Sequence, residues 1–181
     1  MSKVKQLINS YKTFIAVPWK EDAAAQQRVL FCVYPENEEL KLRAKIDEFE
    51  IVTREAKHDW ALYDLTNTFA EWLTSQRYAK SYYQKPHLLQ TLLPKYREYL
   101  VNKFKEFIDS NEIGENTVVT LKGVGSLFGF LKVKDVVENF APLVNGRLLV
   151  LFPGSYENNN YRLLDGYDGW NYLAIPITTD K

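Results

Sequence analysis

Five short apolar runs, spread along the whole chain, most strongly limit what this sequence can fold into. They span residues 28–34, 60–65, 117–121, 148–152 and 172–177. Apolar residues do not alternate regularly with polar ones in these runs, as they would in a strand with one face in water. Such runs, separated by amphipathic helices, are typical of a mostly parallel sheet. We therefore predict an α/β fold: one three-layer domain over residues 1–181, with about five strands and helices on both faces.

Helical patterns fill the segments between these runs. The longest pattern begins at Pro94, a residue that suits the first turn of a helix, and its apolar stripe includes Leu100 and Phe104. A shorter amphipathic helix occupies residues 3–14, and Val17-Pro18-Trp19 ends it. We interpret residues 1–20 as an N-terminal helical arm of the same domain.

The composition is that of a globular protein inside a cell. The chain has 181 residues, a net charge of zero and 46% hydrophobic residues, which suits one domain with a substantial core. Its single cysteine, Cys32, excludes an internal disulfide framework and a Cys-based zinc site. The N-terminal residues lack the apolar core of a signal peptide, and no run approaches the roughly 20 apolar residues of a spanning helix. We therefore expect a cytoplasmic protein.

Charge is unevenly distributed along the neutral chain. Residues 77–105 hold seven Lys or Arg and one Glu, with several tyrosines among them. Three of these cations, Lys95, Arg97 and Lys103, are candidates for a basic contact face. Interleaved cations and aromatic residues can bind single-stranded nucleic acid, although a neutral chain with separate charged patches favours protein partners. The simplest interpretation is an amphipathic helix with its tyrosines in the core.

A glycine-rich segment follows the third apolar run. Its candidate residues are Gly123, Gly125, Ser126 and Gly129. The segment lies between a predicted strand and a predicted helix, like a dinucleotide-binding loop, but its third glycine comes one residue late for that motif. It also lacks the Gly-Lys-Ser/Thr of a phosphate-binding loop. We interpret these glycines as needed for a tight turn and close packing; the alternative is a vestigial nucleotide-binding loop.

A long polar segment lies between the last two apolar runs. We predict a loop here, rich in side chains that suit specific polar contacts. The candidate partner-binding residues are Tyr156, Asn159, Arg162, Asp165 and Asp168. We expect Arg162 to pair with Asp165 or Asp168, and Trp170 and Tyr172 to pack the loop onto the core.

The sequence offers little for catalysis. Cys32 lies within an apolar run, where a thiol acts as a small hydrophobic group. Ser126 and Ser155 lack the sequence context of a serine nucleophile. Acidic residues could form a Mg²⁺ site, but turns and helix starts explain them more simply; they are Glu36, Asp64, Asp165 and Asp168. We therefore expect no enzymatic activity, no cofactor and no metal.

Several sequence blocks together resemble the BrxB family of BREX bacteriophage-defence systems. These blocks are Val29-Leu30-Phe31-Cys32-Val33-Tyr34, Asp64-Leu65-Thr66, Phe69-Ala70-Glu71-Trp72-Leu73, Gly123-Val124-Gly125-Ser126-Leu127-Phe128-Gly129 and residues 147–177. The resemblance implies a BREX component that acts by protein–protein interaction. It also implies other BREX proteins as partners, above all PglZ, the phosphatase-like member of these systems. The alternatives are a nucleotide-binding protein with a degenerate P-loop-like or Rossmann-like fold, and a nucleic-acid-binding protein that uses residues 77–105.

Overall fold

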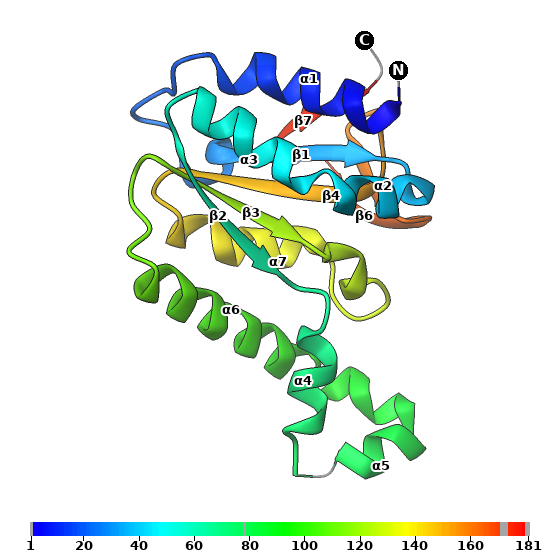
Figure 1. The fold of residues 1–181 in the computed structure, drawn as a ribbon. Helices are drawn as coiled ribbons and strands as arrows, with labels where there is room; N and C mark the ends of the chain where they lie inside the picture. Colours follow the sequence, from blue (N-terminus) through cyan, green and yellow to red (C-terminus); the bar gives the residue numbers. More distant parts are fainter. Residues whose placement is uncertain (1, 78, 171–173, 180–181) are drawn as a thin grey trace.

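The computed structural model describes residues 2–77, 79–170 and 174–179 (Figure 1). Of Trp170 only the backbone is described, and Tyr172 lies outside the described residues. The predicted packing of the Trp170 and Tyr172 side chains onto the core therefore lies outside the described residues.

A seven-stranded mixed sheet forms the centre of the molecule (Figure 1). Its main path runs in the order β2-β3-β4-β1-β7. These strands are Asp59–Asp64 (β2), Thr117–Lys122 (β3), Arg147–Glu157 (β4), Val29–Tyr34 (β1) and Ile175–Ile177 (β7). Each pairing along this path is parallel. The α/β class is confirmed, but the sheet as a whole has more strands than predicted and contains both orientations.

The extra strands come from the segment that we predicted as a loop. β4 continues to Glu157, and the chain turns back as β5 (Asn160–Leu163) and then as β6 (Gly166–Trp170). β5 pairs antiparallel with β4 and with β6. Asn158 and Asn159 connect β4 to β5, and both have positive φ values of 51° and 64°, the conformation that tight two-residue hairpin turns require. The prediction of a loop was therefore wrong, and this segment, residues 153–170, is called the C-terminal hairpin below.

One face of the sheet is covered by three helices, α1 (Lys3–Ile15), α2 (Glu39–Ala44) and α3 (Ile46–Glu55). The predicted N-terminal arm is packed tightly, because α1 buries an apolar stripe that includes Leu7 and Tyr11. The Tyr11 hydroxyl lies 2.6 Å from that of Thr53 in α3, so the polar tip of this buried ring is hydrogen-bonded.

The opposite face is covered by α6 (Leu93–Ser110) and α7 (Val133–Phe140), and α4 (Thr68–Thr74) packs against α6 beyond the end of β2. The α6 helix has Pro94 in its first turn and buries Tyr96, Leu100 and Phe104, as its sequence pattern predicts. The rings of Phe104 and Phe140 stack 4.0 Å apart and join α6 to α7. Both faces thus have apolar cores, and the sheet separates them.

A small helical projection extends beyond the sheet (Figure 1). It contains α5 (Ala79–Gln84) and a 3-10 segment, Pro86–Thr91, and neither has a fully buried residue among those described. The other 3-10 turns are Ala25–Arg28, Glu36–Glu38, Val124–Leu127 and Ala141–Leu143. In the described part of the chain, no helix combines the length and the hydrophobicity needed to cross a bilayer.

Candidate protein-interaction surface

The glycine-rich segment begins with a residue that only glycine suits. Gly123 follows β3 directly and has a φ of +77°. A Cβ atom at this position would lie 2.3 Å from Thr66 Oγ1 and 2.9 Å from Asp64 Oδ1. Because both the conformation and the space exclude a side chain, Gly123 lets the chain after β3 close tightly over the end of β2.

A polar network occupies that end of β2. Asp64 Oδ1 accepts hydrogen bonds from the backbone N–H of Thr66 at 2.9 Å and from its hydroxyl at 2.5 Å. Lys122 Nζ lies 3.6 Å from Asp64 Oδ2, and Arg43 donates to the Thr66 hydroxyl at 3.4 Å. Partial burial acts to raise the pKa of Asp64, but the Thr66 hydrogen bonds and the two cations together lower it. Asp64 is thus a negatively charged structural link between strand ends.

The rest of the segment is also held by internal contacts. Ser126 Oγ lies 2.7 Å from the carbonyl oxygen of Gly123 and 2.9 Å from that of Leu65, and it donates to them. A Cβ atom on Gly125 would be in ordinary contact with Pro153, at 3.5 Å. Gly129 has a φ of +84°. The conformations of Gly123 and Gly129 support the interpretation that these glycines serve turn geometry, whereas Gly125 has room for a side chain and no positive φ.

The position that a phosphate would need at the next helix is filled by the protein itself. Asp168 accepts hydrogen bonds from the first two backbone N–H groups of α7, from Val133 at 2.7 Å and from Lys134 at 2.9 Å. A helix N-terminus attracts anions, and here that anion is a carboxylate of the C-terminal hairpin. The glycine-rich segment therefore does not form the phosphate site that a nucleotide-binding loop would provide.

This role of Asp168 corrects its prediction as a partner-binding residue. Its side chain is only 3% exposed, because it lies between β6 and the start of α7. Arg162 does contact Asp165, one of its two predicted partners, but through the backbone. Arg162 donates to the backbone carbonyl of Asp165 at 2.6 Å, and no ion pair joins it to a carboxylate among the described residues. The hairpin is thus attached to α7 by Asp168 and stiffened by Arg162.

Three of the predicted contact residues do lie on the outside of the hairpin. Asn159, Arg162 and Asp165 are exposed. Tyr156 is half-buried, and its hydroxyl donates to Asn159 Oδ1 at 3.0 Å. These residues can reach solvent, although the turn itself already uses part of their hydrogen-bonding capacity.

The hairpin and the glycine-rich segment meet at two exposed aromatic residues that we did not predict as contact residues. Phe128 is 43% exposed and Tyr167 is 53% exposed. The Phe128 ring lies over Gly166, where a Cβ atom would be 2.8 Å from Phe128 Cε2. Lys132 Nζ lies 5.4 Å from the centre of the Tyr167 ring, in a cation–π arrangement. We call this surface the Phe128–Tyr167 patch.

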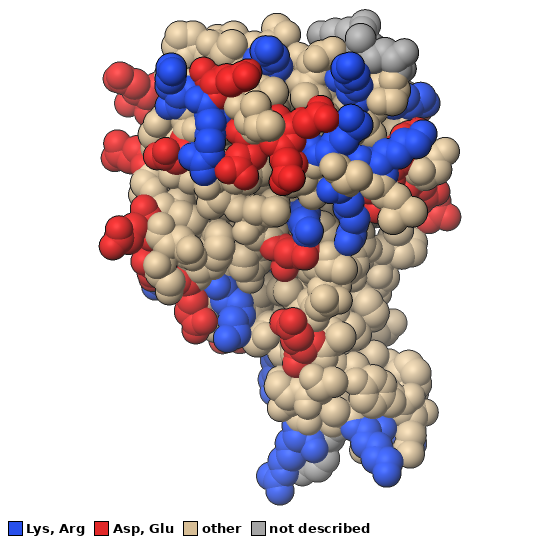
Figure 2. All heavy atoms as spheres, viewed as in Figure 1, with Lys and Arg blue, Asp and Glu red and all other residues tan. Residues whose placement is uncertain are grey.

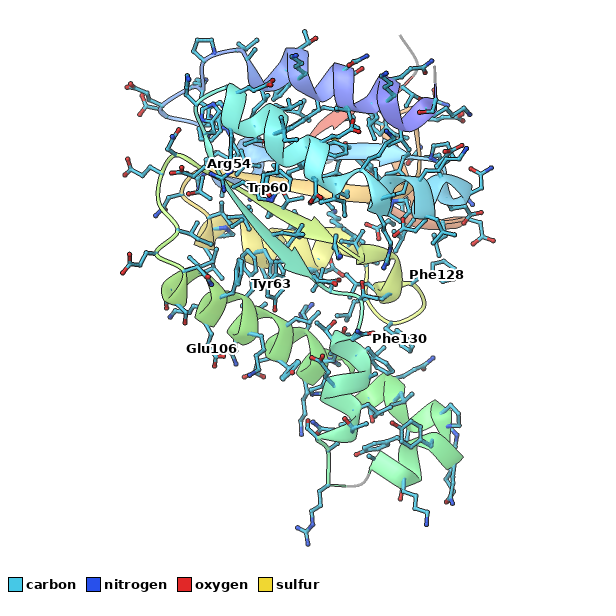
Figure 3. The ribbon with its side chains drawn as sticks, in the orientation of Figure 1. Arg54, Trp60, Tyr63, Glu106, Phe128 and Phe130 are labelled. Carbon is cyan, nitrogen blue, oxygen red and sulfur yellow. The ribbon has the colours of Figure 1, made fainter. Side chains whose placement is uncertain are left out.

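A shallow hollow of about 190 Å³ lies within this patch, and Phe130 and Leu131 also line it. Phe130 stacks on Phe69 of α4 with ring centres 3.9 Å apart, so its position is fixed by the core. Figure 3 shows Phe128 and Phe130 at the turn that follows β3, on the same side of the molecule. A fixed aromatic platform with a cation beside it is typical of protein-binding surfaces.

The predicted basic face does not form one surface. Lys95, Arg97 and Lys103 are all exposed on α6, but a helix turns about 100° per residue, so Arg97 lies well round the helix from the other two. Lys103 also pairs with Glu106 at 3.5 Å. In Figure 2 acidic and basic side chains are mixed over most of the visible face. The structure therefore gives these three cations no common face for a phosphate backbone.

Cys32 and His58 are both engaged within the fold. Cys32 is fully buried in β1, and burial raises the pKa of its thiol far above the ordinary value. His58 stacks on Trp19 at 3.7 Å and lies 2.7 Å from Asn116 Oδ1. Within residues 2–77, 79–170 and 174–179, no three His, Cys, Asp or Glu side chains are grouped so that they could hold a metal ion.

Comparison with known proteins identifies a family. A model of the family described as BREX protein BrxB matches residues 61–176, which is more than half of the chain. The matched part includes the last four residues of β2, the glycine-rich segment and the C-terminal hairpin, whereas β1 and the helices α1 to α3 precede it. No curated protein and no solved structure matches the chain.

Proposed function

Because the chain belongs to the BrxB family of BREX proteins, we propose that it is a component of bacteriophage defence that binds another protein of its BREX system. In this proposal it works in the cytoplasm and has no catalytic activity of its own. Two of the three side chains that we considered as nucleophiles support this proposal. The thiol of Cys32 has no access to solvent, and the hydroxyl of Ser126 is bonded to backbone carbonyl groups.

The observation that carries the proposal is the Phe128–Tyr167 patch. Large aromatic side chains at a surface cost free energy in water, and they contribute strongly to binding when a partner covers them. Both rings lie within the part of the chain that matches the family. Their supports, Gly166 beneath Phe128 and Lys132 beside Tyr167, hold them before any partner arrives. Such preorganisation lowers the entropic cost of association.

We propose PglZ as the partner, on the ground of the family alone. The test is co-purification of the tagged chain with PglZ expressed from the same BREX operon. Phe128→Asp and Tyr167→Ser should each reduce the PglZ recovered by about tenfold or more, since central aromatic contacts are typical hot spots. Arg162→Ala should weaken recovery less, because Arg162 lies beside the patch and is partly used within the hairpin.

Leu40→Asp is the matched control for Phe128→Asp. Leu40 is 82% exposed and lies in α2, outside the family match, so the same change of chemistry should leave recovery of PglZ unchanged. All variants should keep a melting temperature within a few degrees of the wild type, because surface substitutions usually change stability little. Equal recovery with Phe128→Asp and Leu40→Asp would rule out the patch as the binding surface.

A further inference from the structure

The outer edge of β2 is open to solvent. β2 lies at the end of the sheet path, and β3 is its only partner strand among the described residues. Its central residues are half-exposed, and it has neither a proline nor a bulge. Figure 3 shows Trp60 and Tyr63 along this strand, with Arg54 of α3 and Glu106 of α6 near its two faces. Proteins usually protect such an edge against added strands.

The backbone of β2 has hydrogen-bonding groups directed outward. The N–H of Asp59 donates to Asn116, and that of Leu65 donates to Lys122, so the odd-numbered residues point toward β3. Successive residues of a strand direct their backbone groups to opposite sides. Trp60 and Leu62 therefore present their N–H and C=O groups to solvent. Outward N–H and C=O groups of this kind are what an added strand pairs with.

An acidic groove runs beside this edge. It has a volume of about 390 Å³ and lies between the end of β2, α4 and α6. Its charged lining residues are Asp64, Glu71, Lys103 and Glu106. Lys103 is the only cation of the four. It pairs with Glu106, and Asp64 pairs with Lys122, so in the described part of the chain Glu71 is the one acid of the groove without an ion pair. The groove therefore favours a basic side chain from a neighbouring chain.

A second copy of this chain fits the groove poorly. Residues opposite each other in an antiparallel pair direct their backbone groups to the same side, so two copies would pair with Leu62 opposite Leu62 and Trp60 opposite Asp64. Because β2 has no Lys or Arg, the paired strand of a second copy would bring no cation to the acidic groove.

We infer that the outer edge of β2 binds an extended segment of another protein of the BREX system, which adds a strand to the sheet and places a Lys or Arg side chain in the groove beside α6. Backbone hydrogen bonds from Trp60 and Leu62 hold this segment, and the acidic groove selects its sequence. The inference rests on the proposed function, because it names a second site through which the chain binds its partners.

Leu62→Pro and Leu62→Ala separate backbone pairing from packing. Both remove the leucine side chain, but only proline removes the outward N–H, and an edge strand tolerates proline there. The probes are overlapping peptides of about 12 residues, enough for a strand, tiled over the other proteins of the BREX system. At least one peptide with a Lys or Arg should bind the wild-type chain. Leu62→Pro should weaken its binding by about tenfold or more relative to Leu62→Ala.

Glu106→Lys tests the groove without touching the strand, so it covers the case in which Leu62→Pro does not fold. It should weaken the same peptide, whereas Glu98→Lys should not, since Glu98 is exposed on α6 but does not line the groove. Exchange of the peptide's basic residue for Glu should also abolish binding. In hydrogen exchange, the bound peptide should slow the amides of Trp60 and Leu62.

Any one of three outcomes would overturn the inference. The first is that no tiled peptide binds, and the second is that peptides bind Glu106→Lys and Glu98→Lys equally without slowing hydrogen exchange in β2. The third is that the chain dimerises through this edge and that Leu62→Pro makes it monomeric. If PglZ recovery still depends on Phe128 in any of these cases, the proposed function stands and only the edge inference fails. If the chain captures neither PglZ nor any peptide, both fail.

Discussion

β2 and β7 form the two edges of the main sheet path, but they differ in length, in proline content and in exposure. β2 has six residues without a proline, and four of them are half-exposed. β7 has three residues, and its central one, Pro176, has no N–H. Short edge strands and prolines are common means of preventing unwanted pairing. The difference teaches that this protein closes one edge of its sheet and leaves the other available, which fits a binding role for β2.

The largest expected difference between the two edges concerns how firmly each is packed. The Tyr63 ring of β2 lies against Phe107, with ring centres 4.9 Å apart, and against Phe104 at 5.2 Å. Tyr63→Ala should therefore lower the free energy of unfolding by about 3 kcal/mol, whereas Ile175→Ala in β7 should lower it by about 1–2 kcal/mol because that side chain is only half-buried. Urea denaturation measures both. Equal losses would mean that the two edges are equally well anchored.

A somewhat smaller effect is expected where the chain closes over the end of β2. Gly123→Ala should lower the free energy of unfolding by about 2 kcal/mol, because its φ of +77° and the contact with Thr66 both oppose a side chain. Gly114→Ala is the control, since no atom lies within 4 Å of its added Cβ and its φ is not positive. A similar cost in both variants would show that Gly123 is not specifically required.

The charge at the end of β2 should make stability depend on pH. The folded state lowers the pKa of Asp64 below its ordinary value of 3.8. Its contribution is therefore fully present above that value and is lost as the pH falls through the lower pKa of the folded state. Asp64→Asn should flatten the fall of stability in this acidic range, measured by urea denaturation at several pH values. In the Lys122→Gln variant the free energy of unfolding should fall less steeply with decreasing pH than in the wild type, because this change removes one of the cations that lower the pKa of Asp64.

The smallest effect is expected at the closed edge. Pro176→Val restores one N–H to β7 and should change the free energy of unfolding by less than about 0.5 kcal/mol. It should also leave the chain's association state and peptide binding unchanged, because a strand of three residues offers little to an added partner. Sedimentation velocity would reveal the contrary result, a new dimer, and would show that Pro176 alone had kept this edge closed.

The sequence predicted the parts of the fold that depend on local patterns. The apolar runs around Phe31, Val119 and Val150 do form central strands, and the stripe on α6 faces the core. The C-terminal hairpin was missed, although the adjacent Asn158 and Asn159 are residues that tolerate the positive φ of a tight turn. The many polar residues around them favoured a loop instead.

The candidate surface was less predictable, because it depends on residues that are far apart in the sequence. Phe128 meets Gly166 only after the glycine-rich segment and the hairpin have packed together. Asp168 likewise reaches the N-terminus of α7 across 34 residues of chain. An acidic residue in a polar segment gives no local sign that it will be buried on a helix N-terminus.

The position of β1 has a consequence for how the protein is made. β1 lies between β4 and β7, and its register joins Val29 to Leu148 and Leu30 to Ile175. During synthesis, β1, whose six residues are all buried in the folded protein, therefore has no partner strand until most of the chain has left the ribosome. Pairings between such distant residues form slowly, and an unpaired strand of this kind can aggregate. The last quarter of the chain thus completes the sheet, and until then residues 29–34 are the segment most prone to aggregate.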